Sequence, residues 1–144
     1  MRNFILLLSF VLVVFYSCTK DDDSRNIPNC DSRSEVIAEN IFNSINTSNY
    51  SISNVSLNGD CLEITLGSSG CNANLWEMEL YSTNSFYTVY PMQRTVKLKL
   101  TNNQACLAFF QKTKSFDLTA FRMEGQNSLP LNIVGWDKQI MYKY

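Results

Sequence analysis

The sequence contains no histidine. Because histidine is the commonest general base near neutral pH and a frequent metal ligand, its absence excludes a Ser-His-Asp triad, a Cys-His pair and any histidine-ligated metal. No two cysteines have the Cys-x-x-Cys spacing of zinc sites and redox dithiols. There is also no glycine-rich phosphate-binding loop, and residues 67–70 (Gly-Ser-Ser-Gly) differ from the Gly-x-Ser-x-Gly nucleophile elbow. We therefore expect no metal, no cofactor and no enzymatic activity.

Charged residues are also few. They make up 17% of the chain, and the formal net charge is −1. Without an excess of positive charge, a broad attraction for nucleic acid is excluded. Hydrophobic residues at 45% and aromatic residues at 12% argue against a disordered chain. The 144 residues suit one folded domain without a nucleic-acid partner.

One long apolar run is present, at the N-terminus. Residues 4–15 are almost wholly apolar, which is too short to span a bilayer comfortably but typical of the core of a signal peptide. Cys18 closes this run and resembles the acylated cysteine of a bacterial lipobox, although Phe15 and Tyr16 are bulkier than the usual residues. We predict that residues 1–17 are a removable lipoprotein signal peptide and that Cys18 carries acyl chains such as palmitate. An ordinary secretory signal is the alternative.

An acidic stretch follows the predicted lipid site directly, at Lys20, Asp21, Asp22 and Asp23. It resembles the export signal that places surface lipoproteins of Bacteroidota on the outer face of the outer membrane. A solvated tether without any address is the alternative. We expect residues 18–29 to form a flexible acidic tether, held on the outer membrane by the lipid and facing the extracellular side.

Four cysteines remain when Cys18 is set aside, and an even number in an exported domain predicts two disulfides. Three pairings are possible. We favour Cys30–Cys61, which would pin the start of the domain to its first hairpin, and Cys71–Cys106, whose members each lie near the start of a predicted strand. A zinc site built from four scattered thiolates is the competing interpretation.

A single helix is expected. Ser32 followed by Glu35 fits a capping box, and Ile37, Ile41 and Ile45 recur at helical spacing. We predict an amphipathic helix over residues 32–46 that packs on a sheet.

From residue 50 onward the apolar pattern has a period of two, which predicts strands. The strongest local signal is a hairpin at Asn58-Gly59 that returns from Cys61 to Leu66. Trp76 belongs to the inner face of a strand at 74–81. Residues 107–110 are so apolar that we expect their strand to be buried on both faces. Strands are also expected over residues 86–90, 96–100, 106–113, 129–134 and 138–144.

About eight short strands behind one helix favour an Ig-like antiparallel β-sandwich, as a single β domain over residues 30–144. A lipocalin-like eight-stranded barrel is the alternative.

The region from about residue 50 to residue 144 resembles uncharacterised surface lipoproteins of Bacteroidota with a C-terminal β-sandwich domain. The resemblance rests on a small-residue loop before Cys71, the alternation from Trp76 to Leu80, a lysine-rich strand, Cys106, and Phe116-Asp117-Leu118. It implies the Cys71–Cys106 disulfide and no known activity.

Candidate chemistry is sparse. Glu77 and Glu79 would lie about 7 Å apart on one strand face, a spacing that suits an acid pair of a glycosidase but also any solvated strand. Trp136, Tyr87 and Tyr90 are candidates for an aromatic platform that stacks on sugars. We therefore expect a non-catalytic, lipid-anchored surface protein that binds a glycan or a protein partner. A structural or accessory component of an outer-membrane assembly is the alternative.

Overall fold

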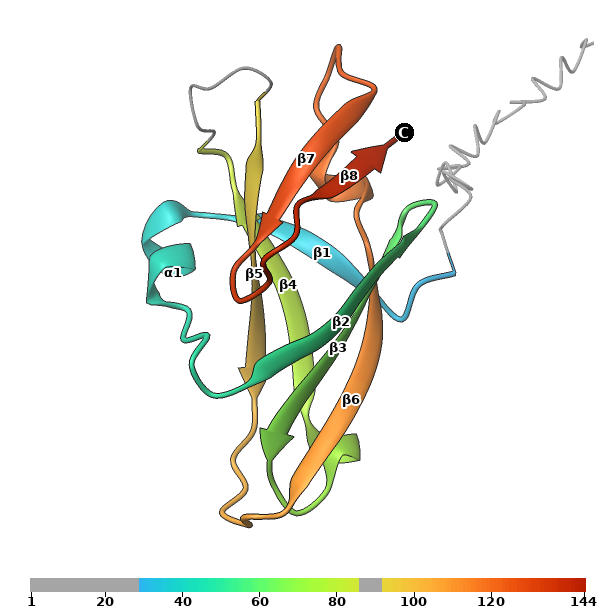
Figure 1. The fold of residues 1–144 in the computed structure, drawn as a ribbon. Helices are drawn as coiled ribbons and strands as arrows, with labels where there is room; N and C mark the ends of the chain where they lie inside the picture. The colour runs from blue at the N-terminus through green and yellow to red at the C-terminus, as the bar shows by residue number, and fades with distance from the viewer. Residues whose placement is uncertain (1–28, 86–91) are drawn as a thin grey trace, which may run out of the picture.

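The computed structural model describes residues 29–85 and 92–144, and its architecture is mainly β. The elements are β1 (Ser32–Ile37), α1 (Glu39–Ser44), β2 (Ser51–Asn58), β3 (Cys61–Ser69), η1 (Ala73–Leu75), β4 (Glu77–Thr83), β5 (Arg94–Thr101), β6 (Phe109–Asp117), η2 (Thr119–Phe121), β7 (Ser128–Ile133) and β8 (Ile140–Lys143). The eight strands form one sheet in the order β2-β3-β6-β1-β4-β5-β7-β8 (Figure 1).

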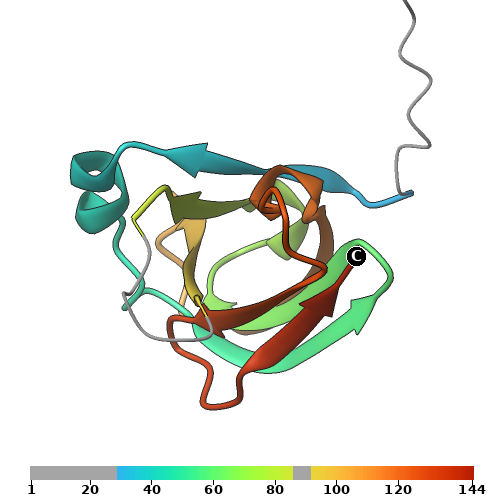
Figure 2. The same ribbon diagram turned by 90° about the horizontal axis from the view of Figure 1, so that it is seen from above.

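The sheet curls around a single interior, so that its two edge strands, β2 and β8, approach each other (Figure 2). The prediction of a mainly β domain is confirmed, and the nearly closed shape fits the barrel alternative. An Ig-like sandwich is not what the strand order shows. The expectation of a purely antiparallel sheet is wrong, because β1 runs parallel to both β4 and β6 and β5 runs parallel to β7. Parallel neighbours need long crossover connections, which here pass over the ends of the barrel.

The helix predicted over 32–46 is wrong for its first half, because residues 32–37 form β1. This strand lies between β6 and β4 and pairs with both, from Ser32 with Phe116 to Ile37 with Thr83. Backbone pairing on both sides outweighs a local capping signal. The helix is reduced to the six residues of α1, which buries Phe42 and leaves Ile41 53% exposed.

The hairpin of β2 and β3 forms as predicted, with a bulge between Ile52 and Asn54. Its two-residue loop is Gly59-Asp60, one position later than the Asn58-Gly59 dipeptide suggested. Gly59 has φ +57°, a conformation that glycine adopts without steric strain. The strands of the final hairpin, β7 and β8, also pair as expected.

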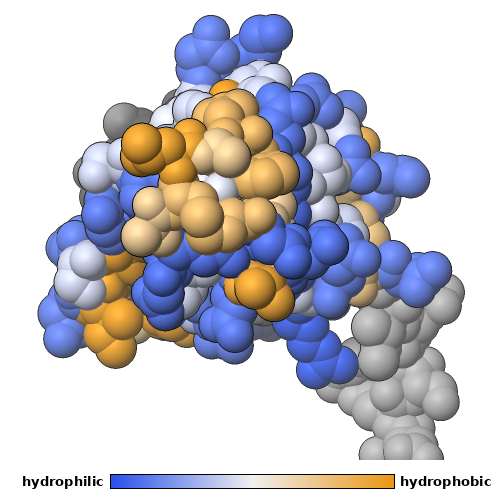
Figure 3. Space-filling view, turned by 90° about the horizontal axis from the view of Figure 1, so that it is seen from below, coloured by the Kyte–Doolittle hydropathy of each residue, from blue (hydrophilic) through white to orange (hydrophobic). Residues whose placement is uncertain are grey.

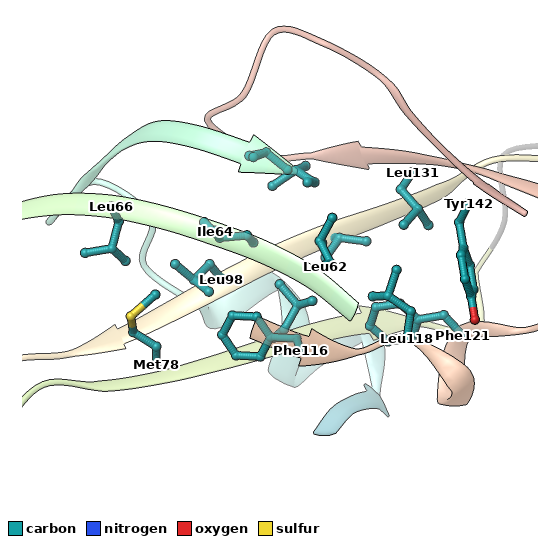
Figure 4. Packing of buried hydrophobic residues seen from close by; sticks show 14 of the residues in the cluster. Leu62, Ile64, Leu66, Met78, Leu98, Phe116, Leu118, Phe121, Leu131 and Tyr142 are labelled. Atoms are coloured by element: carbon teal, nitrogen blue, oxygen red, sulfur yellow. The ribbon is translucent and has the colours of Figure 1, made fainter. Parts of the chain in front are cut away.

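The core is filled by alternate residues of the strands on both sides of the barrel. Leu62, Ile64 and Leu66 point inward from β3 and are fully buried (Figure 4). They meet Leu98 of β5 and Met78 of β4, so one continuous cluster joins the two halves of the sheet. Within the described residues, no helix combines the length and the apolar character needed to cross a bilayer.

Side chains rather than backbone pairs close the seam where the two ends of the sheet meet. The Tyr50 hydroxyl donates a hydrogen bond of 2.7 Å to the carbonyl oxygen of Leu98, and burial raises the pKa of Tyr50 to about 12. At the other end of this seam, Asp60 accepts hydrogen bonds from Tyr142 at 2.5 Å and from Arg122 at 2.6 Å. We call these three residues the Asp60 clasp.

The Asp60 clasp makes stability depend on pH. Burial by itself would raise the pKa of Asp60, but the hydrogen bonds from Tyr142 and Arg122 outweigh burial and lower the pKa below its usual value. A carboxyl group whose pKa is lower in the folded state stabilises the fold at pH values above its unfolded pKa of about 3.9. This contribution is lost as the pH falls through the pKa of the folded state. Asp60→Asn should therefore lower the free energy of unfolding at pH 7 by about 2 kcal/mol and flatten its decline below about pH 4.

Urea unfolding of the wild type and of Asp60→Asn at pH 7 and at steps down to pH 3 measures this effect. Asp137→Asn is the matched control, because Asp137 is exposed and makes no hydrogen bond or ion pair within the described residues. Equal pH slopes for the wild type and Asp60→Asn would contradict the prediction.

Candidate functional site

Two connections cross the lower end of the barrel in Figure 1. Residues 70–76 lead from β3 to β4, and residues 102–108 lead from β5 to β6. Each passes from one half of the sheet to the other, because β3 and β6 lie on one side of β1 whereas β4 and β5 lie on the other. The Cys71–Cys106 disulfide joins the two connections, so the pairing favoured from the sequence is present.

Amide side chains hold the two connections in one conformation. The Gln104 side-chain oxygen accepts hydrogen bonds from the backbone nitrogens of Cys71 (2.6 Å) and Asn72 (2.9 Å), and its nitrogen donates to the Asn72 carbonyl oxygen. Asn102 donates to the carbonyl oxygen of Ser69 at 2.7 Å. A Cβ at Gly70 would lie 2.7 Å from the Gln104 oxygen, so a larger residue there would displace the Gln104 side chain from these hydrogen bonds.

The connections expose large apolar side chains instead of burying them. Leu107 is 92% exposed, Leu75 is 70% exposed and Phe109 is 63% exposed. From below, an apolar surface surrounded by hydrophilic residues covers this end of the molecule (Figure 3). We call Leu75, Leu107 and Phe109, together with the exposed Cys71–Cys106 disulfide, the apolar tip.

The expectation that residues 107–110 lie in a strand buried on both faces is therefore wrong. β6 begins only at Phe109, so Leu107 belongs to the crossing connection. The Phe109 ring covers the outer face of β3 at Gly67, where a Cβ would overlap the ring. The apolar run in the sequence thus marks an exposed surface, and that run was the available signal for the site.

The rim of the apolar tip is polar but uncharged. Residues 70–76 and 102–108 contain no Asp, Glu, Lys or Arg, and their polar residues are mostly asparagine and glutamine. An apolar centre without charges and with a hydrogen-bonding rim is typical of protein interfaces. It offers no electrostatic attraction to anionic lipid or nucleic acid.

The second disulfide, Cys30–Cys61, is also present as favoured from the sequence. It ties the start of the described chain to the first residue of β3, whereas Cys71 follows the end of β3. A strand of this length spans about 27 Å, so the chain enters the domain far from the apolar tip. The predicted lipid site at Cys18 and the export residues Lys20, Asp21, Asp22 and Asp23 lie outside the described residues.

Of the three residues predicted to form an aromatic platform, Trp136 alone lies within the described part of the chain. Trp136 is half-buried against the core, with the Lys138 ammonium group 5.8 Å from its ring centre. Tyr87 and Tyr90 lie outside the described residues. Trp76 is buried as expected, and its indole nitrogen makes no hydrogen bond within the described residues.

The glutamates of β4 point outward, as predicted from the alternation. Both line a hollow of 410 Å³, and a second hollow of 460 Å³ shares Glu35 and Tyr81 with it. The larger hollow lies beneath α1, and the smaller lies between β1, β4 and β6. Glu79 forms an ion pair of 2.8 Å with Lys99 and accepts a hydrogen bond from Tyr81.

These contacts decide which chemistry the glutamates could support. The hydrogen bond from Lys99 lowers the pKa of Glu79 most, and the one from Tyr81 lowers it further. Burial and the hydrogen bond to Glu79 raise the pKa of Tyr81 to about 12. Glu79 is thus held ionised, whereas a glycosidase acid needs a raised pKa. Within the described residues, no three His, Cys, Asp or Glu side chains gather as metal ligands.

Comparison with known proteins supports the fold. No family model matches the chain, and no curated protein matches it. A crystal structure of a protein of unknown function, described as DUF1344 and from Bacteroides vulgatus, is similar, with a TM-score of 0.53 and 13% sequence identity. The similarity covers 78% of this chain and 56% of that one, so the chain spans little more than half of its neighbour's length. The two proteins therefore share an architecture.

Proposed function

We propose that this chain is a non-catalytic, lipid-anchored surface protein that binds another protein through the apolar tip. The exposure of Leu75, Leu107 and Phe109 on a disulfide-braced pair of loops carries this proposal. Burying a leucine or phenylalanine side chain stabilises a complex by about 1.5–3 kcal/mol each. Three such side chains, already held in place, can bind at a small entropic cost.

A protein partner fits the apolar tip better than a glycan does. Sugar platforms use the faces of aromatic rings, but Leu75 and Leu107 are aliphatic and Trp136 is half-buried elsewhere. The uncharged amide rim supplies hydrogen bonds without the desolvation cost of ionised groups.

The position of the tip also fits an anchored protein. The Cys30–Cys61 disulfide fixes the point where the tether would join the domain, and the apolar tip lies at the opposite end of β3. A domain held by lipid on Cys18 can therefore present the tip away from the membrane.

The lipid anchor is tested by mass spectrometry of the protein extracted from membranes. We expect a mature chain that begins at Cys18 and carries a diacylglyceryl group. Reduction should add about four protons, because the two disulfides hold the remaining four thiols. Cys18→Ser is the control and should remain unprocessed and unacylated. A wild-type N-terminus at any residue other than Cys18 would contradict the anchor.

The surface address is tested separately, by adding protease to intact cells. Replacing Asp21, Asp22 and Asp23 together by asparagine should leave the protein in the membrane fraction but protect it from the protease. Replacing Asp31 by asparagine is the matched control, since Asp31 is bound to Ser115 of the folded domain. If the triple variant is cleaved as fast as the wild type, the acidic stretch is not a surface-export signal.

The binding surface is tested by a photo-crosslinking residue placed at position 107 in intact cells. We expect a discrete adduct with a second protein, because the side chain at this position is almost fully exposed at the centre of the tip. Position 141 on β8 is the matched control, since Met141 is apolar and 46% exposed but lies outside the tip.

A substitution confirms which contacts hold the partner. With the crosslinking residue at position 109, Leu107→Asp should reduce the adduct at least tenfold while the melting temperature stays unchanged, because surface substitutions rarely alter stability by more than about 0.5 kcal/mol. Equal adducts at positions 107 and 141, or an adduct that consists only of a second copy of this chain, would overturn the proposal.

A further inference from the structure

β1 is too short to fill the space between β6 and β4. It pairs with β6 only through Ser32 and Arg33, and its pairing with β4 begins at Leu80. Below these positions, Glu77–Glu79 of β4 pair only with β5, and Phe109–Lys114 of β6 pair only with β3, within the described residues, whereas the backbone nitrogen of Ser115 donates to the Asp31 carboxylate. We call the gap between these two unpaired edges the slot. The 410 Å³ hollow lies along it.

Two lysines of β6 span the slot. The Lys112 ammonium group donates to the carbonyl oxygen of Trp76 at 2.5 Å, and the Lys114 ammonium group donates to the carbonyl oxygen of Met78 at 3.0 Å. These carbonyl groups of β4 therefore face β6. The lysines supply the donors that the backbone of a neighbouring strand would otherwise supply.

The position of β1 indicates the width of the slot. β1 is the one strand between β6 and β4, and the slot continues its line below Ser32. The reach of a lysine side chain and its hydrogen bond, about 9 Å, is an upper limit on this separation and is compatible with two strand spacings of about 4.8 Å each.

The lysines lie on the inner face of the sheet. Lys112 is paired with Leu66 and Lys114 with Ile64, and both partners are fully buried. Burial lowers the pKa of Lys112, and the nearby charge of Lys114 lowers it further. Inward-pointing charges also protect edge strands against aggregation. Here two such charges bind the carbonyl oxygens of Trp76 and Met78, and Lys114 also lines the open hollow.

We propose that the slot binds an extended peptide segment of another protein as an added strand, with glutamate at alternate positions. On the inner face such a glutamate would lie between the Lys112–Lys114 side and the apolar side chains of Trp76 and Met78. The glutamate carboxylate would be attracted by the ammonium groups of Lys112 and Lys114. Its methylene groups would contact the apolar side chains of Trp76 and Met78. On the outer face the hollow carries both signs of charge, because Arg33 lines it with Glu77 and Glu79 and because Glu79 is paired with Lys99, so neutral residues suit the intervening positions.

This inference goes beyond the proposed function, because strand addition in the slot does not require the apolar tip. The two surfaces adjoin where β4 and β6 meet the crossing connections. The two binding surfaces can be told apart by the backbone amide signals of β4 and β6. Binding in the slot should shift these signals along both facing edges, whereas binding at the apolar tip should not.

The test uses the full chain in detergent and the synthetic peptide acetyl-Glu-Thr-Glu-Thr-Glu-amide. We expect saturable shifts of the backbone amide signals of Trp76–Glu79 and Phe109–Lys114 in a nitrogen-15 titration. The same peptide methylated on both threonine nitrogens should bind at least tenfold more weakly, because alternate residues of a strand donate toward the same neighbouring edge. A peptide with lysine in place of each glutamate should also bind at least tenfold more weakly than the glutamate peptide.

The lysines are tested by Lys112→Met and Lys114→Met, each of which should weaken binding of the glutamate peptide at least tenfold. Lys143→Met on the exposed face of β8 is the matched control and should leave it unchanged. The peptide comparisons need no substitution, so they decide the question even if a lysine variant does not fold. Absence of saturable shifts at millimolar peptide, shifts confined to the apolar tip, or affinities of the parent and methylated peptides within threefold would overturn the proposal.

Discussion

The backbone pairing of β1 with both β6 and β4 is the interaction on which the rest of the structure depends. It converts two groups of strands, β2-β3-β6 and β4-β5-β7-β8, into one sheet. Ser34 reinforces the junction from the inner face, because its hydroxyl donates a hydrogen bond of 2.6 Å to the carbonyl oxygen of Asp117. Without β1, two edges would be left open at the middle of the barrel, where unpaired backbone groups are costly.

The same junction explains where the unusual surfaces lie. Because β1 separates β3 and β6 from β4 and β5, the chain must cross the barrel end twice, once in each direction. The disulfide and the amides of Asn102 and Gln104 satisfy the backbone of these crossings. None of these contacts requires Leu75 or Leu107 to be apolar. Their character is therefore unexplained by folding and points to an interaction outside the domain.

Local patterns in the sequence predict the strands well, but they do not predict how the strands are joined. The alternation of Leu62, Ile64 and Leu66 places all three in the core, and the two favoured disulfides are both present. The error at residues 32–46 has a physical cause, because the pairing partners of β1 lie some 45 to 85 residues later in the chain. No window of local sequence contains that information.

The site was harder to foresee than the fold, for a related reason. An apolar run such as residues 107–110 predicts burial only if its strand occupies the interior, and that depends on the position of β6 in the sheet. Lys112 and Lys114 are an error of the opposite kind. Charged residues that alternate with polar ones suggest a solvent-exposed strand, yet both lysines face inward beside Leu66 and Ile64.

The two disulfides attach other parts of the chain near the two ends of β3. Cys61 and Cys71 lie at the two ends of β3, which is paired along its length with β2 and β6. A tether attached near Cys30 is therefore connected to the apolar tip through one continuous, doubly paired strand. Because four thiols stay paired only in an oxidising compartment, this connection is stable outside the cytoplasm. In the anchored protein that we propose, a rigid strand between the tether and the tip would keep the apolar surface away from the membrane, where burial in lipid would compete with binding to a protein.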